Sequence, residues 1–392
     1  MKLKLLSAAI SAALLSTAPA TVSADDFTDA LTGGKVKMDV RLRYESVDDS
    51  INKDADALTV RTRLGYETGS FMSMTAYVEF EDTRTAFGMD DYAPQSAGYA
   101  VVADPEVTEL NQAFLLYTGL SDTAVKVGRQ RVILDNARFV GNVGWRQDEQ
   151  VYDALAVINN SLPDTTVIYG YVHKVEGILP KFDLDVSTHL FNASYTGFGF
   201  GKLSAYAYLI ELDATEDESN TFGIRFAGAT NVADGVKLSY TLEYAAVEDD
   251  IFGTDNDADY MLGELGVTVS GITGKFGYEV LGSDDGTYGF QTPLATKHAF
   301  NGWADVFLGT PVDGLQDMYV SIGGKFAGVK LAAIYHDFSS DEGSTDYGTE
   351  LDLVAAKKFT KNYSAGIKLA SYSADNYKSD TDKVWIWGQL KF

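Results

Sequence analysis

Apolar and polar residues alternate one by one along most of this chain. The clearest case is residues 35–45, KVKMDVRLRYE, where every second residue is apolar and most of the residues between them are charged. A period of two predicts a β-strand with one apolar face and one charged face. Residues 58–67 and 72–81 repeat this division, so the first three predicted strands share it.

The same rule places fifteen more strands along the chain. They are predicted at 108–118, 123–132, 149–159, 164–174, 186–196, 201–212, 220–230, 235–246, 259–270, 272–282, 315–325, 329–339, 347–359, 363–374 and 383–392. The prediction is therefore an all-β chain of eighteen strands. Because 108–118 and 149–159 alternate poorly, a count of sixteen is the alternative.

The predicted strands are joined by short and long connections in turn. Short links fall at 68–70, 119–122, 159–163, 197–201, 229–235, 271, 326–328 and 360–362. Longer loops fall at 46–57, 82–107, 133–148, 175–185, 213–219, 247–258, 283–314, 340–346 and 375–382. Outer-membrane barrels have short periplasmic turns and long extracellular loops, so the pattern predicts a transmembrane antiparallel β-barrel rather than a soluble sandwich.

Both ends of the chain agree with export to an outer membrane. Lys2 and Lys4 precede an apolar run at 5–15 and the small triplet at 22–24, which is typical of a signal peptide cut after Ala24. We therefore expect residues 1–24 to be the signal peptide and 25–392 to be a single barrel domain. The final strand ends in Phe392, which resembles the signal read by the barrel assembly machinery. No later stretch has the roughly 18 apolar residues of a membrane-spanning helix.

Composition narrows the choice of partners. The formal net charge is −25, and the chain has no cysteine, which excludes disulfides and thiolate metal sites. Acidic residues gather in the predicted long loops, where they would form an acidic extracellular rim. Such a rim could bridge divalent cations to lipopolysaccharide beside the outer-membrane lipid, or could merely keep the loops soluble. The negative charge opposes nucleic-acid binding.

One segment concentrates positive charge in this acidic chain. Residues 126–153, KVGRQRVILDNARFVGNVGWRQDEQVYD, contain Lys126 and four arginines interleaved with acids. The four arginines are Arg129, Arg131, Arg138 and Arg146, and the acids are Asp135, Asp148, Glu149 and Asp153. The segment is either a functional site in the pore, in which Asp135 and Glu149 take part, or a solvated loop whose arginines pair with nearby acids.

A barrel of this size would turn its charged faces into pore walls. Barrels of 16–18 strands leave an aqueous lumen. The polar faces of the first two strands carry Arg41, Arg43, Arg61 and Arg63, and rings of arginine select anions. The alternative is that these arginines face acids such as Glu79 and Glu81 across the pore and create a field with no strong preference.

The long loop at 283–314 is aromatic and nearly neutral. It contains His298, Phe300, Trp303 and Asp305, and loops of this length are usually functional or disordered. So apolar a segment is expected to fold into or over the lumen as a constriction, as is the loop at 133–148. Packing on the rim between other loops is the alternative.

Two stretches resemble the porin family that carries the alginate-export domain. They are GRQRVILDNARFVGNVGWRQDEQVYDAL at 128–155 and TPLATKHAFNGWADVFLGTPVDGLQDMYV at 292–320. The resemblance implies a monomeric, eighteen-stranded outer-membrane barrel of a Gram-negative bacterium. It also implies an arginine-rich constriction for an anionic uronate polymer, to which Arg129, Arg131, Arg138 and Arg146 would belong. This chain is shorter than expected of a dedicated polymer exporter.

Enzymatic readings find little support. The four histidines are far apart, and neither HExxH nor GxSxG around a serine occurs. A barrel lipid hydrolase with distant serine and histidine is the enzymatic alternative. Residues 255–259 mimic the start of a calcium-binding loop but lack its glycine and final glutamate. We therefore predict a channel, without cofactor or metal, for small anionic or polar solutes. Transport of an acidic polysaccharide such as alginate and a structural or adhesive barrel are the alternatives.

Overall fold

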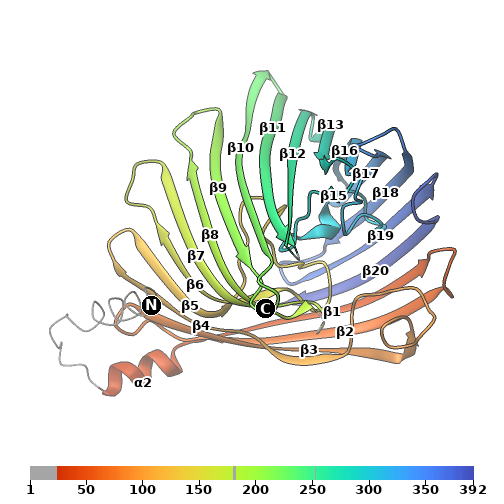
Figure 1. Ribbon diagram of the computed structural model, residues 1–392. Helices are drawn as coiled ribbons and strands as arrows, with labels where there is room; N and C mark the ends of the chain where they lie inside the picture. Colours follow the sequence, from red (N-terminus) through yellow and green to blue (C-terminus); the bar gives the residue numbers. More distant parts are fainter. Residues whose placement is uncertain (1–23, 180–181, 252) are drawn as a thin grey trace.

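The computed structural model describes residues 24–179, 182–251 and 253–392 as a closed antiparallel β-barrel of eighteen strands (Figure 1). Each strand pairs with the next along the chain, β13 pairs with β16 across a long loop, and β20 pairs with β1 to close the ring. The barrel strands are β1 (Lys35–Asp48), β2 (Ala55–Glu67), β3 (Met74–Asp91), β4 (Val107–Leu120), β5 (Thr123–Gln130), β6 (Val151–Asn159), β7 (Thr165–Glu176), β8 (Leu184–Tyr195), β9 (Gly201–Glu211), β10 (Glu218–Ala233), β11 (Val236–Ile251), β12 (Thr254–Val269), β13 (Ile272–Leu281), β16 (Leu315–Phe326), β17 (Val329–Ser339), β18 (Asp346–Lys358), β19 (Tyr363–Ala374) and β20 (Thr381–Lys391).

The predicted eighteen strands are confirmed, and the count of sixteen is wrong. Two predicted loops are shorter than expected. β3 continues to Asp91, and β11 and β12 fill most of 247–258, so the acids there stand on a long hairpin. Residues 255–259, with the partial calcium-loop pattern, belong to β12 and form no loop. In the described part of the chain, no cluster of three or more His, Asp or Glu could hold a metal.

The two faces of the sheet differ as the alternation predicts. On β1 and β2 the outward side chains Leu42 and Leu64 are 42% and 52% exposed, whereas the inward Arg43 and Arg61 are each 1% exposed. A closed barrel leaves no unpaired strand edge, and an apolar outer band suits lipid. The protein is therefore an integral outer-membrane barrel. Over the described ranges no helix is long and apolar enough to span a membrane.

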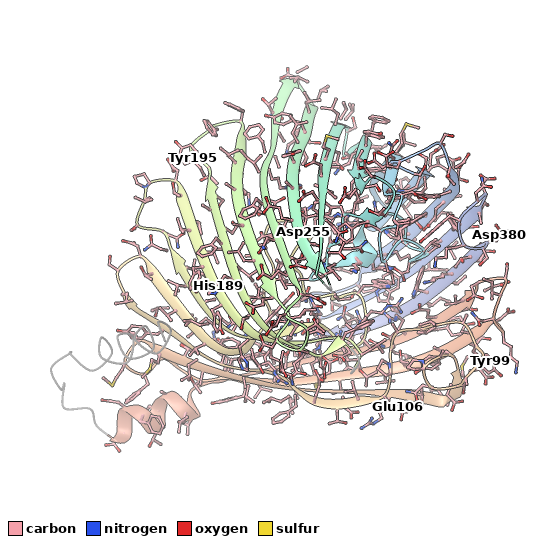
Figure 2. All side chains as sticks on the ribbon, in the orientation of Figure 1. Tyr99, Glu106, His189, Tyr195, Asp255 and Asp380 are labelled. Carbon is pink, nitrogen blue, oxygen red and sulfur yellow. The ribbon has the colours of Figure 1, made fainter. Side chains whose placement is uncertain are left out.

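The two ends of the barrel differ in the length of their connections. Tight hairpins at one end include Ser270–Gly271 and Ala327–Gly328, where all four residues have positive φ, as two-residue type I′ turns require. Figure 2 places Tyr195, beside a short turn, at the opposite end from Tyr99, Glu106 and Asp380 on long connections. The first end is periplasmic and the second extracellular.

Three smaller elements lie among the described residues outside the barrel wall. The small hairpin β14 (Ser283–Asp284) and β15 (Tyr288–Gly289) and the 3-10 helix η2 (Lys297–Ala299) lie in the connection between β13 and β16. Helix α2 (Ala24–Thr32) packs Phe27 edge-on against Phe71 at the periplasmic end. The predicted signal peptide, residues 1–24, lies outside the described residues except for Ala24.

Candidate constriction and charged chambers of the lumen

The segment between β5 and β6, residues 131–150, is bound by arginines of β1. Arg41 and Arg61 are direct cross-strand partners, so two like charges stand side by side on the inner wall. Arg41 donates from Nε to Gln147 Oε1 at 2.8 Å and also to the carbonyl of Arg146. Arg43 donates to the carbonyl of Trp145. The loop therefore supplies oxygens that separate and solvate the arginines of the wall.

Glu149 joins the same loop to β2 and β4. Its carboxylate lies 3.3 Å from Arg63 Nη1 and accepts hydrogen bonds from Arg131 and, at 2.8 Å, from Asn111. Burial opposes ionisation, but Arg63 and Arg131 outweigh it and lower the pKa of Glu149 to about 2. Arg131 also lies 2.8 Å from Glu79. Glu149 is thus a buried, ionised residue that attaches the loop to the barrel wall.

The connection between β13 and β16, residues 282–314, is held by inner-face residues of β13 and β18 and by Arg138 of the 131–150 segment. Arg138 donates to Glu279 at 2.8 Å and to Asn301 at 2.9 Å, and its guanidinium lies 4.9 Å from the ring of Phe300. The backbone N–H groups of Trp303 and Ala304 donate to Asp352 at 3.1 Å and Glu350 at 2.7 Å on β18. These contacts attach the aromatic segment to inner-face carboxylates.

The two segments also meet at Asp305. Its carboxylate lies 2.9 Å from Arg146 Nη2 and 3.0 Å from Lys383 Nζ on β20, and it accepts a 2.6 Å hydrogen bond from His298 Nδ1. Arg146 also pairs with Glu45 of β1 at 2.9 Å. Burial, aided by Lys368 and Arg146 and opposed by Asp305, lowers the pKa of His298 to about 3, so the imidazole is neutral.

All four tryptophans of the chain gather beside this junction. Lys368 Nζ on β19 lies 3.7 Å from the ring of Trp303, 4.3 Å from Trp145 and 5.5 Å from Trp385. Trp387 packs edge-on against Trp145. Lys368 also donates to His298 Nε2 at 2.7 Å. One buried ammonium in an aromatic cage therefore links both segments to the wall.

Below the 131–150 segment lies a polar chamber of about 550 Å³, here called the arginine chamber. Its charged lining comprises six cations and four anions, namely Lys37, Arg41, Arg61, Arg63, Arg131 and Lys391 against Asp39, Glu67, Glu79 and Glu149. Most of these cations are paired: Arg61 lies 2.8 Å from Asp39, and Lys37 contacts Glu67 at 2.6 Å. Arg41 differs, because among the described residues no carboxylate lies within 4 Å of it.

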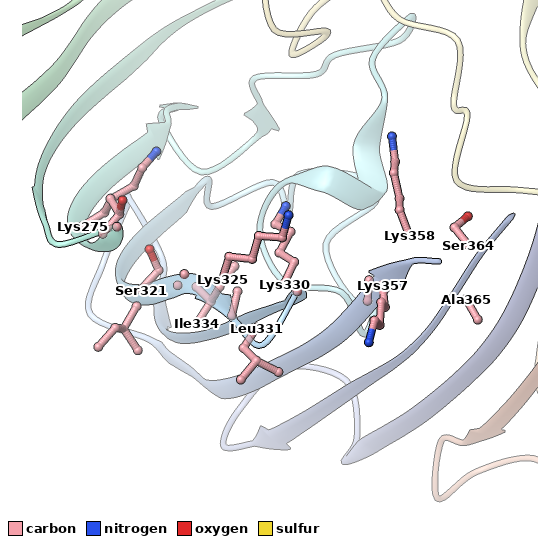
Figure 3. Close-up of a pocket in the computed structure, with 18 of the residues that line it drawn as sticks. Lys275, Ser321, Lys325, Lys330, Leu331, Ile334, Lys357, Lys358, Ser364 and Ala365 are labelled. Atoms are coloured by element: carbon pink, nitrogen blue, oxygen red, sulfur yellow. The ribbon is translucent and has the colours of Figure 1, made fainter. Parts of the chain in front are cut away.

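A second cavity of about 790 Å³, the lysine mouth, lies at the periplasmic end of β13 and β16–β19 (Figure 3). Its lining has five lysines, Lys275, Lys325, Lys330, Lys357 and Lys358, and no acid. Lys275 pairs with Glu264 at 2.9 Å, but within the described chain Lys325, Lys330 and Lys358 form no salt bridge. Figure 3 shows Lys330 and Lys358 on one side of the sheet and Lys357 on the other.

The structure brings most of the predicted site residues together, with two exceptions. Arg129 lies on the same face of β5 as Val125 and Val127, where it forms a bidentate pair with Asp153 at 2.8 and 2.9 Å. That face is the outer wall, so the placement of Arg129 in the lumen was wrong. Asp135 faces the lumen elsewhere, accepting from Lys202 at 2.8 Å near β8 and β9. Lys126 lies inside, 3.9 Å above the ring of Phe114.

Several residues at these sites were missed by reasoning from the sequence. They are Asp104, Gln147, Lys297, Lys325, Lys330, Lys358, Lys368 and Lys383. Lys325, Lys330 and Lys358 could have been found, because each lies near the end of a predicted strand, next to a tight turn. Gln147, which binds Arg41, and Asp104, which pairs with Arg43 of β1, carry no such signal, since their partners are remote in sequence.

Comparisons with known proteins agree with this architecture. The alginate export family matches residues 34–278, which is more than half of the chain. This chain belongs to the alginate export family. The match covers the segment at 128–155 that carried the resemblance, whereas the one at 292–320 lies beyond it. No curated protein matched the chain.

Solved outer-membrane proteins share the fold of this alginate export family member. Pseudomonas aeruginosa OpdK, determined with vanillate, is 15% identical with a TM-score of 0.72, covering 92% of this chain and 99% of its own. Pseudomonas aeruginosa OccK9 (OpdG) is 14% identical with a TM-score of 0.71, covering 93% and 100%. Acinetobacter baumannii OccAB2 is 14% identical with a TM-score of 0.72, covering 93% and 99%. The barrel and the family place the protein in the outer membrane of a Gram-negative bacterium.

Proposed function

We propose that this barrel is a porin-like channel through which small anionic or polar solutes diffuse. In this proposal the segments at 133–148 and 283–314 fold inward as the constriction. The observation that carries it is the lysine mouth, where three lysines without acidic partners line the exit toward the periplasm in a chain of net charge −25. Unpaired cations in a narrow lumen raise the local concentration of anions.

The arginine chamber also supports a preference for anions. Its lining carries two more cations than anions, and Arg41 has no carboxylate partner among the described residues. OpdK, which shares the fold, was determined with the anion vanillate. An anion that has crossed the constriction would pass from one positive region to the next.

Transport of an acidic polysaccharide is the second candidate, because the family is named for alginate export. The burial of residues where the 131–150 segment meets the wall argues against it. Arg43 and Arg61 are each 1% exposed, and Gln147 is fully inaccessible to water. A uronate chain would need both inward segments to move before it could pass.

We also propose two partners at the ends of the barrel. The acidic extracellular loops would hold divalent cations that bridge to lipopolysaccharide. The barrel assembly machinery would recognise the last strand, because the side chain of Phe392 is 61% exposed while its backbone N–H is bonded to Met38.

The test is the reversal potential of single channels in a planar bilayer under a salt gradient. Wild type is expected to prefer anions, and the triple variant Lys325→Gln, Lys330→Gln, Lys358→Gln should lose most of that preference. Lys357→Gln is the control, because its side chain lies on the opposite face of β18 from Lys358 (Figure 3), so removing this one charge should leave the reversal potential unchanged. Cation preference in wild type, or no conductance at all, would contradict the proposal.

A further inference from the structure

A third cavity lies at the extracellular end, above the junction at Asp305. It has a volume of about 320 Å³ and is called the outer pocket here. Its walls come from four connections between strands, which contribute Val101, Val143, Ile178 and Leu308 among others, and from Leu184 at the start of β8. A pocket of this size, formed by loops over a channel, is suited to one small solute before it enters the constriction.

The wall of the outer pocket is mostly apolar. Val101 is 56% exposed and Leu308 is 45% exposed, although both belong to loops and neither faces lipid. Leu294 and Val175 complete the apolar surface from below. Exposed aliphatic side chains that converge on a cavity indicate a ligand with an apolar body.

The floor of the outer pocket carries charged side chains, and one of its cations has no carboxylate partner among the described residues. Arg146 and Lys383 share the carboxylate of Asp305, and His298 is neutral. Lys297 lines the same pocket, yet among the described residues it has no carboxylate within salt-bridge distance. Burial, together with the nearby Arg138, lowers the pKa of Lys297. A half-buried ammonium without a partner would gain from pairing with an anion.

We propose that the outer pocket is a binding site for a small carboxylate with an apolar body, held by a salt bridge to Lys297 and by contacts with Val101, Leu184 and Leu308. This inference rests on the proposed function, since it names the class of anion that the channel admits. A uronate fits poorly, because its hydroxyl groups would lose water against an aliphatic wall that offers few partners.

The protein contains its own reporter for this site. Trp145 stacks on His298 at a centroid distance of 5.0 Å, and His298 lines the outer pocket. The other three tryptophans lie in the same cluster, so no distant tryptophan contributes a constant background. Binding in the outer pocket is expected to change tryptophan emission in the purified barrel.

The experiment titrates the full barrel in detergent with three probes and follows tryptophan emission. Benzoate has both the charge and the apolar body, benzyl alcohol lacks the charge, and glucuronate lacks the apolar body. Benzoate should give a saturable change, and the other two should bind about tenfold more weakly or worse. Equal binding of benzoate and glucuronate would overturn the inference.

Variants locate the site. Lys297→Met should weaken benzoate about tenfold while leaving benzyl alcohol unchanged. Lys378→Met is the control, because it removes an exposed loop lysine outside the pocket. Unaltered benzoate binding by Lys297→Met would overturn the assignment. An anion-selective channel with no preference for benzoate would sink this inference alone, whereas a cation-selective channel would sink the proposed function instead.

Discussion

The arginines of β1, β2 and the 131–150 segment contrast with the lysines at the mouth of β16–β18. Arg43, Arg63 and Arg146 are almost fully buried, and each touches at least two carboxylates. In the described part of the chain Lys325, Lys330 and Lys358 touch none. A buried, paired charge holds parts of a protein together, whereas an unpaired charge in a lumen acts on passing ions. The densest cluster of cations is therefore mainly structural.

The largest loss of stability is expected from removing one of the buried, paired arginines of β1, β2 and the 131–150 segment. Arg146→Ala would leave Glu45 and Asp305 short of a partner in a buried site, which costs about 3–5 kcal/mol of folding stability. Thermal unfolding, followed by circular dichroism and by the heat-dependent mobility of the barrel, measures this loss. Lys325→Ala is the control and should unfold like wild type. If both variants unfold at the wild-type temperature, the structural role assigned to the buried arginines is wrong.

An intermediate effect, on both ion preference and stability, is expected from substituting Arg41. This residue lies on β1 beside the buried arginines, but among the described residues no carboxylate lies within 4 Å of it. Arg41→Gln should reduce anion preference in the bilayer, as removal of a mouth lysine would. It should also lose about 1–2 kcal/mol from its hydrogen bonds to the loop. Arg129→Gln, on the outer wall, should leave the reversal potential unchanged. A larger shift for Arg129→Gln than for Arg41→Gln would contradict the assigned faces.

The smallest effect concerns Asp148, a buried acid in the 131–150 segment. Burial and the nearby carboxylates of Glu109 and Glu81 raise the pKa of Asp148 to about 9. The group is therefore neutral at pH 7 and adds a negative charge above about pH 9. Because the folded state holds this proton and the unfolded state does not, stability falls as pH rises from about 4 to 9.

Asp148→Asn keeps the position neutral at every pH. Between pH 7 and 10, wild type should lose more anion preference than Asp148→Asn, and the variant should be the more stable protein at pH 8. Every other titratable group is the same in both proteins, so the difference between their pH profiles isolates Asp148. Identical pH profiles would show that Asp148 does not ionise in this range.

The lumenal placement of Arg129 was wrong because it disregarded the alternation along its own strand. The alternation along β5 puts Arg129 on the face of Val125 and Val127, away from Lys126. Its neighbours in the arginine-rich stretch suggested a shared role, but Arg131 lies beyond the end of β5 and is free to turn inward to Glu79. Proximity in sequence does not put two residues on one face of a sheet.

The alternation along the chain is enough to specify the barrel. The period of two, the strand count, the division into a lipid face and a lumenal face, and the order of turns and loops are local properties that neighbouring residues specify. Which charges are paired depends instead on the folded barrel. Arg41 meets Gln147, and Arg146 meets Glu45 and Asp305, across sequence separations of 106, 101 and 159 residues. A salt bridge depends on distance in space, and closure of the barrel sets that distance.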